Sequence, residues 1–159
     1  MNNKIPMTKK GKKKLQKELN NLKNIIRPRI IASISEARAH GDLKENAEYH
    51  AAKEEQSFCE RKIQEFEFKL SNSYVVDIKK MSIHKKIFFG ATVKILNIKL
   101  NKIYTYQIVG DDESDFKKNL ISINSPMAKG LMKKKVNEIA RIKTPVGAVS
   151  YKILKIVYI

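Results

Sequence analysis

Residues that could form covalent cross-links or span a membrane are scarce in this sequence. Its 159 residues include one cysteine, Cys59. A single cysteine excludes an intrachain disulfide and a cysteine-based zinc site, which agrees with a reducing compartment. No apolar run follows the basic first residues as a secretion signal requires, and no stretch of about 18 apolar residues could span a membrane. We therefore expect a cytoplasmic protein with no membrane partner.

Acidic residues are also few, 16 against 33 lysines and arginines, which gives a formal charge of +17 and a pI near 9.9. This excess predicts an anionic partner, nucleic acid or a nucleoprotein machine, and the alternative is a lysine-rich composition without functional meaning. Between Glu36 and Glu60, seven acids stand against three basic residues, whereas residues 1–30 hold ten basic residues and one acid. Charge is therefore separated along the chain.

Two long amphipathic stretches come first. Thr8 is placed to cap a helix, with Met7 before it as a staple residue. Apolar residues then recur three or four positions apart, which predicts a helix with one wet face. They are Leu15, Leu19, Leu22, Ile26, Ile30, Ile34 and Ala37. Pro28 lies inside this run and removes a hydrogen bond, and we expect a kink rather than a stop because the periodicity continues.

The second stretch has seven positions at alternating steps of three and four, a heptad seam. They are Tyr49, Ala52, Gln56, Cys59, Ile63, Phe66 and Leu70. Gly41, Asp42 and Asn46 interrupt the two stretches and predict a short turn, so the two helices should pack antiparallel. Each arm of roughly 30 residues would be on the order of 45 Å long.

The pattern changes from helical to alternating near Ser71-Asn72-Ser73. We therefore expect an N-terminal coiled coil over residues 1–76, with an acidic tip at 41–48, and a C-terminal globular domain over residues 77–159. A short helix is expected within 77–159, with Ser125 as cap, Pro126 at its first position and Gly130 as its stop. The expected strands are Tyr74–Val76, Ile87–Phe89, Thr92–Leu96, Ile103–Val109, Ile139–Ile142 and Ala148–Tyr158. The fold class is α+β, with a small antiparallel sheet.

Asp42 and Glu45 stand three apart across the turn, so both carboxylates can point beyond the end of the rod and share one ion. Oxygen ligands favour a hard cation such as Mg²⁺ or Mn²⁺. Mg²⁺ dehydrates reluctantly and is usually held by one or two carboxylates plus phosphates and water. The tip is therefore half of a metal site. A partner that already holds one metal would complete a two-metal arrangement, which activates water against a phosphodiester.

Other residues near the turn allow other interpretations. His40 and His50 bracket it and offer a zinc site, although no paired histidine spacing supports one. Arg38 and Lys53, one on each arm, are either phosphate contacts or ordinary solvated charges. Tyr49 occupies a seam position and is interpreted as packing rather than as a platform for a base.

The segment Gly41 to Lys53 resembles the tip motif of the bacterial transcript cleavage factors of the Gre family, and the resemblance extends over essentially the whole chain. The other matching segments are Ile5–Thr8, Leu70–Asn72, Phe89–Val93, Ile108–Glu113, Ser125-Pro126 and Gly130-Leu131. This resemblance implies an N-terminal antiparallel coiled coil that enters the secondary channel of RNA polymerase, and a C-terminal domain of FKBP-like fold that docks outside it.

The same resemblance implies roles for individual residues. Asp42 and Glu45 match the two acids that help hold the second Mg²⁺ of the polymerase and its attacking water. Arg38 and Lys53 match basic positions proposed to meet the displaced RNA, and Lys53 stands where arginine is frequent, so a bidentate contact is lost while the charge remains. Residues matched to stretches tied to polymerase docking are Asp111, Asp112, Glu113, Ser125 and Pro126.

The acidic segment Asp111 to Asp115 has a second interpretation, as a solvated turn at the end of a strand. Pro145-Val146-Gly147, expected to join the last two strands, departs from the glycine pair frequent at this turn in the family.

Three function classes remain at this point. The first is an accessory factor that is no enzyme alone, with the polymerase elongation complex and the RNA 3′ end as partners, no cofactor besides the polymerase Mg²⁺, and a monomeric state. The second is an independent metal-dependent phosphodiesterase, which needs more ligands than one tip supplies. The third is a basic coiled-coil nucleic-acid-binding or scaffolding protein, in which Asp42 and Glu45 are incidental.

Overall fold

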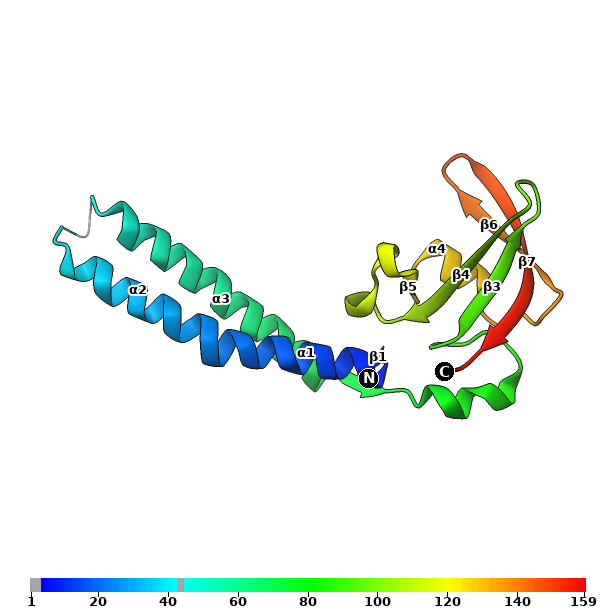
Figure 1. Cartoon of the computed structure of the whole chain (residues 1–159), viewed down its shortest axis with the longest axis horizontal. Helices are drawn as coiled ribbons and strands as arrows, with labels where there is room; N and C mark the ends of the chain where they lie inside the picture. The colour runs from blue at the N-terminus through cyan, green and yellow to red at the C-terminus, as the bar shows by residue number, and fades with distance from the viewer. Residues whose placement is uncertain (1–3, 43–44) are drawn as a thin grey trace. The chain divides into compact units, whose positions relative to one another are not determined.

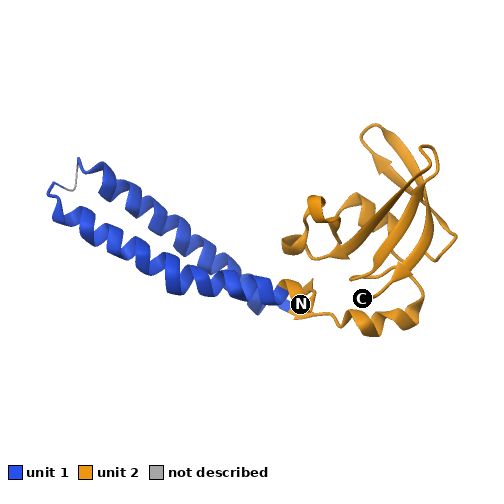
Figure 2. Ribbon diagram, in the orientation of Figure 1, with its two compact units in different colours: residues 1–3, 12–73 blue, residues 4–11, 74–159 orange. Residues whose placement is uncertain are grey.

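The computed structural model of the chain describes residues 4–42 and 45–159, which form two compact units (Figure 2). The hairpin unit contains the described part of residues 12–73, and the sheet unit contains residues 4–11 and 74–159. The chain thus crosses from one unit to the other at Ser73 and Tyr74, and the first described residues belong to the sheet unit rather than to the helical hairpin that follows them.

The first arm of the hairpin is helical throughout. It consists of α1 (Lys9–Asn21), the π-helical segment η1 (Leu22–Ile26) and α2 (Arg27–Ala39), and the second arm is α3 (Ala47–Ser71). α2 and α3 run side by side in opposite directions (Figure 1). All fourteen residues that the sequence assigns to the two apolar stripes are buried or half-buried, which confirms the helical periodicity of the first arm and the heptad seam of the second.

The first arm continues through Pro28. The unbroken periodicity predicted this continuation. Pro28 is preceded by η1, in which the Arg27 N–H donates to the Leu22 carbonyl, five residues earlier. A proline lacks an N–H and collides with the carbonyl four residues before it. The wider π turn takes up this disturbance, so it has the form of a bulge in the helix, a recognised cause of helix distortion.

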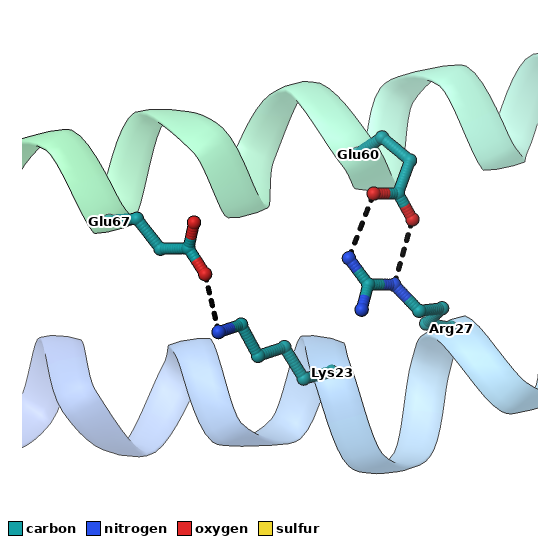
Figure 3. Close-up of polar contacts among 4 residues, drawn as sticks. All are labelled: Lys23, Arg27, Glu60 and Glu67. Carbon is teal, nitrogen blue, oxygen red and sulfur yellow. Dashed lines mark hydrogen bonds and ion pairs between the residues drawn. The ribbon is translucent and has the colours of Figure 1, made fainter.

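Two ion pairs join the arms at the middle of the hairpin (Figure 3). The guanidinium of Arg27 donates from Nε and Nη2 to the two carboxylate oxygens of Glu60, both at 2.8 Å. Lys23, one helical turn before Arg27, pairs with Glu67. Hydrogen bonding to Glu60 raises the pKa of Arg27. The bidentate pair fixes the register of the arms more specifically than a point charge would.

The sheet unit is built on five strands in the spatial order β5-β4-β3-β7-β6. Their bounds are Thr92–Asn97 for β3, Lys102–Val109 for β4, Leu120–Ser122 for β5, Ile139–Thr144 for β6 and Gly147–Val157 for β7. The helix α4 (Pro126–Leu131) packs against β6 and β5, and the core includes fully buried Val93, Ile95, Ile108, Leu131 and Ile153. The fold class is α+β, as expected.

Short segments complete the sheet unit. β1 (Ile5–Met7) and β2 (Ser73–Val75) form a separate two-stranded sheet, in which the Val76 N–H donates to the Met7 carbonyl at 2.9 Å. Three 3₁₀ turns connect the larger elements: η2 (Ile78–His84), η3 (Asp111–Glu113) and η4 (Phe116–Lys118). Thr8 caps the start of α1 as expected, because its Oγ1 accepts from the Gly11 N–H at 2.9 Å.

The sheet differs from the expected antiparallel one, because β5 pairs with β4 in parallel. The chain between them turns through η3 and η4 and returns in the direction of β4, which a tight hairpin cannot achieve. The expected strand at Ile87–Phe89 is also wrong. Ile87 is fully buried, but its N–H donates to the Lys134 carbonyl at 3.0 Å and its carbonyl accepts from Lys133, so a loop satisfies its backbone.

The short helix α4 begins as expected and ends later than expected. Ser125 caps it through a hydrogen bond from the Ala128 N–H at 3.2 Å, and Pro126 is its first residue. Gly130 lies inside the helix, which ends at Leu131. A Cβ at position 130 would lie 2.7 Å from Ile142 Cγ1, so this glycine permits close packing on β6 and is not a stop signal.

Candidate functional site

The turn between the two arms is held by Asn46. Its Oδ1 accepts from the Tyr49 N–H at 3.0 Å, which caps α3, and its Nδ2 donates to the Ala37 carbonyl near the end of α2 at 2.7 Å. Gly41 has a φ of +117°, a conformation that glycine adopts without strain. One side chain thus ties both helix ends to each other, and a left-handed glycine turns the chain out of α2.

The turn presents the two predicted carboxylates together. Asp42 and Glu45 are exposed and line one open hollow of about 470 Å³. The other residues that line the hollow are His40, Asn46, Ala47 and Glu48. Leu43 and Lys44, which belong to the same motif, lie outside the described residues. The side chains of Asp42 and Glu45 are therefore both exposed at the turn.

Glu48 is a further carboxylate that the sequence reasoning did not single out. It occupies the first turn of α3, where a negative side chain is favoured by the helix dipole. Its position three residues after Glu45 was the available signal. Carboxylate oxygens suit a hard cation better than a soft one, but the three side chains line the hollow without forming a complete site. In the described residues 4–42 and 45–159, no three His, Cys, Asp or Glu side chains converge closely enough to hold a metal ion.

The predicted basic residues lie on both arms behind the turn. Arg38 is exposed in the last turn of α2, and Lys53 is exposed on α3, where its Nζ donates to Gln56 at 3.2 Å. Tyr49 is half-buried, and His50 meets its ring edge-on with the centroids 5.6 Å apart. The hairpin end therefore has acid at its apex and one exposed cation on each side.

Glu113, one of the predicted docking acids, is engaged inside the sheet unit. Its Oε2 accepts from the N–H groups of Thr8 and Gly110, both at 3.1 Å, and its Oε1 accepts from the Thr8 hydroxyl. A Cβ at Gly11 would lie 1.7 Å from the Glu113 carboxylate, so this glycine makes the approach possible. Glu113 thus joins the start of α1 to the 3₁₀ turn η3.

Asp111 and Ser125 belong to one hydrogen-bond network. Asp111 accepts from the Ser122 hydroxyl and from Asn124 Nδ2, the latter at 2.9 Å, while Ser125 donates to the Ser122 carbonyl at 2.6 Å. Sequence reasoning missed Ser122 and Asn124, because their partner lies more than ten residues earlier in the chain. Two further predicted docking residues, Asp112 and Pro126, are exposed.

Comparisons with known proteins agree with this architecture. The family model for the N-terminal domain of transcription elongation factors GreA and GreB matches residues 5–75, and the model for their C-terminal domain matches residues 82–158. The chain is 67% identical over 159 residues to transcription elongation factor GreA of Buchnera aphidicola subsp. Schizaphis graminum (strain Sg), with 100% of both chains covered. It is 56% identical over 155 residues to GreA of Yersinia pestis bv. Antiqua (strain Angola), with 98% of each covered.

Among solved structures, the GreA factor homolog 1 (Gfh1) protein of Thermus thermophilus is 22% identical, with a TM-score of 0.44 over 96% of this chain and 97% of that one.

A helical hairpin with an acidic turn, followed by a small sheet unit and matched by both domain models, defines a two-domain transcription elongation factor. No helix within the described residues is both long and apolar enough to cross a membrane. The chain belongs to the GreA/GreB family of transcription elongation factors. The family resemblance seen in the sequence is thereby confirmed.

Proposed function

We propose that this transcription elongation factor binds RNA polymerase, inserts its hairpin into the secondary channel and stimulates Mg²⁺-dependent cleavage of the RNA 3′ end in backtracked complexes, so that elongation resumes. The observation that carries the proposal is the joint exposure of Asp42 and Glu45 at the hairpin turn. The relatives named transcription elongation factor GreA support the choice of partner.

The chemistry follows from what Mg²⁺ requires. This ion keeps several waters and is usually held by one or two carboxylates together with phosphate oxygens. In the proposed complex, Asp42 and Glu45 supply the carboxylates, and the polymerase supplies the remaining ligands and the RNA phosphate. A metal pair of this kind stabilises both the attacking and the leaving oxygen of a phosphodiester. The tip completes the polymerase site and is not an enzyme by itself.

Arg38 and Lys53 are proposed to contact the displaced RNA. They are exposed on opposite arms behind the acidic apex, a position that suits backbone phosphates on either side of the cleaved bond. Lys53 offers a single ammonium on a flexible stem, so it supplies charge without the planar fork of an arginine. We expect its replacement to weaken RNA contact less than replacement of Arg38.

Docking on the polymerase is proposed to use Asp111, Asp112, Glu113, Ser125 and Pro126. The hydrogen bonds divide these residues by role. Glu113, Asp111 and Ser125 hold neighbouring segments of the sheet unit in place through these hydrogen bonds, whereas Pro126 is exposed at the start of α4. Pro126→Ala is therefore the cleaner variant for a binding measurement, since changes at Glu113, Asp111 and Ser125 would also disturb the fold.

The test is RNA cleavage in a backtracked polymerase complex, with and without the protein, beside protein and RNA alone in Mg²⁺. Asp42→Asn and Glu45→Gln should each reduce stimulated cleavage by at least about 100-fold, because metal-borne stabilisation is worth several kcal/mol, and leave polymerase binding intact. Glu36→Gln is the matched control, since Glu36 is an exposed acid on α2 that does not line the hollow.

Three outcomes would contradict the proposal. Cleavage without polymerase would indicate the independent phosphodiesterase. Loss of binding together with cleavage in the tip variants would mean that tip and dock are not separable. Binding without stimulation by the wild-type protein would leave a factor whose acidic tip is not catalytic, which is the scaffolding alternative.

A further inference from the structure

The four long strands of the sheet unit have one face directed away from the core, which we call the outer face. Val93 and Ile95 of β3 are fully buried, as is Ile153 of β7, which lies opposite Ile95 in the strand register, so these residues define the inner face. Side chains alternate between faces along a strand. Lys94, between Val93 and Ile95, therefore lies on the outer face, and its register partners lie there with it.

Five basic side chains share this outer face. Lys94 pairs with Lys155 across β3 and β7, Arg141 and Lys143 alternate with buried residues of β6, and Lys152 lies opposite Leu96. All are exposed except Lys152, which is half-buried. The strand segments 92–109 and 139–158 contain no aspartate or glutamate at all. The outer face is thus positive without any acid of its own strands.

This arrangement is unfavourable for the isolated sheet. Residues directly opposite in an antiparallel pair have Cβ atoms about 4.5–5.5 Å apart, and like charges there are destabilising. Lys94 and Lys155 are such a pair. Throughout residues 4–42 and 45–159, none of the five cations takes part in an ion pair. An external anion laid across the strands would relieve the repulsion.

We propose that the outer face of β3, β4, β7 and β6 binds the phosphate backbone of duplex DNA, independently of the hairpin tip. Four of its five cations are lysines, which act as point charges on phosphates and do not read sequence. The hydroxyls of Thr92, Thr105 and Ser150 lie between them on the same face and can donate to phosphate oxygens.

The position of the aromatic residues favours a duplex over a single strand. Proteins that hold single strands without sequence preference stack bases on aromatic rings. The tyrosines of these strands, Tyr104, Tyr106 and Tyr151, lie opposite Ile95, Val93 and Ala140, which places them on the inner face. Tyrosine and tryptophan are also the residues that settle at a membrane surface. In the described strands, the outer face has no aromatic ring for either purpose.

The experiment measures binding of the full chain to a fluorescent 30-base-pair DNA by anisotropy over a salt series. The outer-face variant carries Lys94→Gln, Arg141→Gln, Lys143→Gln and Lys155→Gln. Each phosphate contact contributes about 0.9 to the slope of log K against log salt, so the slope should become shallower by about 3 to 4 and the affinity at low salt should fall at least about tenfold.

Two variants that remove the same number of charges serve as controls. One changes exposed lysines elsewhere in the sheet unit, and the other changes exposed lysines of α1. The first set is Lys117, Lys118, Lys129 and Lys135, and the second is Lys9, Lys10, Lys13 and Lys14, each to Gln. Both should keep most of the wild-type slope. If the first control set lowered the slope as much as the outer-face variant does, the effect would come from net charge alone. If the second set did so, the binding site would lie on α1.

Circular dichroism establishes that each variant is folded. If the fourfold variant fails to fold, Lys94→Gln with Lys155→Gln removes the directly opposed pair alone, and the slope should become shallower by about 2. Single-stranded RNA of the same length and vesicles containing phosphatidylserine complete the set. Both should bind more weakly than the duplex, and equal or tighter binding to either would overturn the assignment to duplex DNA.

Discussion

The hairpin and the sheet unit bury similar side chains to different depths. The sheet unit encloses seven large side chains that are almost completely inaccessible, including Ile95 and Ile153. The best-buried residues of the hairpin seam, Ala37, Cys59 and Ile63, each keep 3% of their surface exposed, and Leu19 keeps 9%. Two helices can cover only one stripe on each other, whereas a curled sheet with a helix across it covers a residue from all sides.

The difference shows how each unit is kept in one conformation. The sheet unit is specified by the packing of its core. The hairpin depends more on polar ties, which are the Asn46 bridge at its turn and the Arg27–Glu60 pair at its middle. The turn is therefore held by polar ties rather than by a packed core, and it exposes carboxylates.

The largest expected effect comes from the same substitution made in both units. Ile153→Ala should destabilise the sheet unit by about 4 kcal/mol, and Ile63→Ala should destabilise the hairpin by about 2 kcal/mol, because a thin seam can close around a cavity more easily. Guanidinium unfolding followed by near-ultraviolet circular dichroism reports mainly on the sheet unit, which holds five of the six tyrosines, and the 222 nm signal reports mainly on the hairpin. If both variants lost the same free energy of unfolding, the hairpin seam would be packed as tightly as the core of the sheet unit.

Glu113→Ala tests whether the sheet unit also depends on a polar tie. It removes the acceptor of three hydrogen bonds from Thr8 and Gly110, and we expect a loss of about 1–2 kcal/mol. Amide hydrogen exchange at Thr8 and Gly110 should accelerate. Glu138→Ala, at an exposed acid of the same unit, should change stability by less than about 0.5 kcal/mol. Protected amides in Glu113→Ala would show that strand pairing alone holds residues 4–11.

Asn46→Ala tests the tie in the hairpin. It removes the α3 cap and the bond to Ala37, so the hairpin should lose about 1–2 kcal/mol. Burial raises the pKa of the Cys59 thiol, so this group reacts slowly until the seam opens. Its labelling rate by a disulfide reagent should rise by about 5- to 30-fold in the variant. Asn20→Ala, an exposed asparagine within α1, should leave the rate unchanged, and a rise there would mean that labelling does not report the turn.

The smallest effect concerns the pH dependence of the hairpin. The hydrogen bond from Lys69, at 2.8 Å, lowers the pKa of Glu65 from its ordinary 4.5. A lowered folded-state pKa stabilises the fold above pH 4.5, and this contribution is lost as the pH falls through the lowered value. Lys69→Met should therefore lower the stability of the hairpin slightly above pH 4.5, leave it unchanged at low pH, and so flatten the acid limb of the unfolding curve. An unaltered acid limb would show that the pair is too solvated to matter.

Local periodicity explains which parts of the structure could be predicted. The helical seams, the turn at Gly41 to Asn46, and the caps Thr8 and Ser125 depend on residues within one or two turns of each other, and all are confirmed. The exposure of the two tip carboxylates follows from the same local turn, while their role as metal ligands stays a prediction. Their metal and their partner lie beyond the chain, so these stay predictions.

Long-range pairing explains what was missed. The parallel strand β5 depends on two intervening turns, and Ile87 is satisfied by a loop almost 50 residues away, which a short apolar run does not reveal. The Glu113 contacts join residues 105 apart. The acidic run by itself favours a docking surface or a solvated turn. Neither interpretation predicts that Glu113 accepts hydrogen bonds from Thr8 near the start of the chain.

The π segment gives the first arm a spare residue. Its seam positions run from Leu15 to Ala37 in six steps over 22 residues, while the second arm takes six steps over 21, from Tyr49 to Leu70. The three successive steps of four between Leu22 and Ile34 already record this surplus in the sequence, and η1 accommodates it. The two arms therefore need not have equal numbers of residues to stay matched.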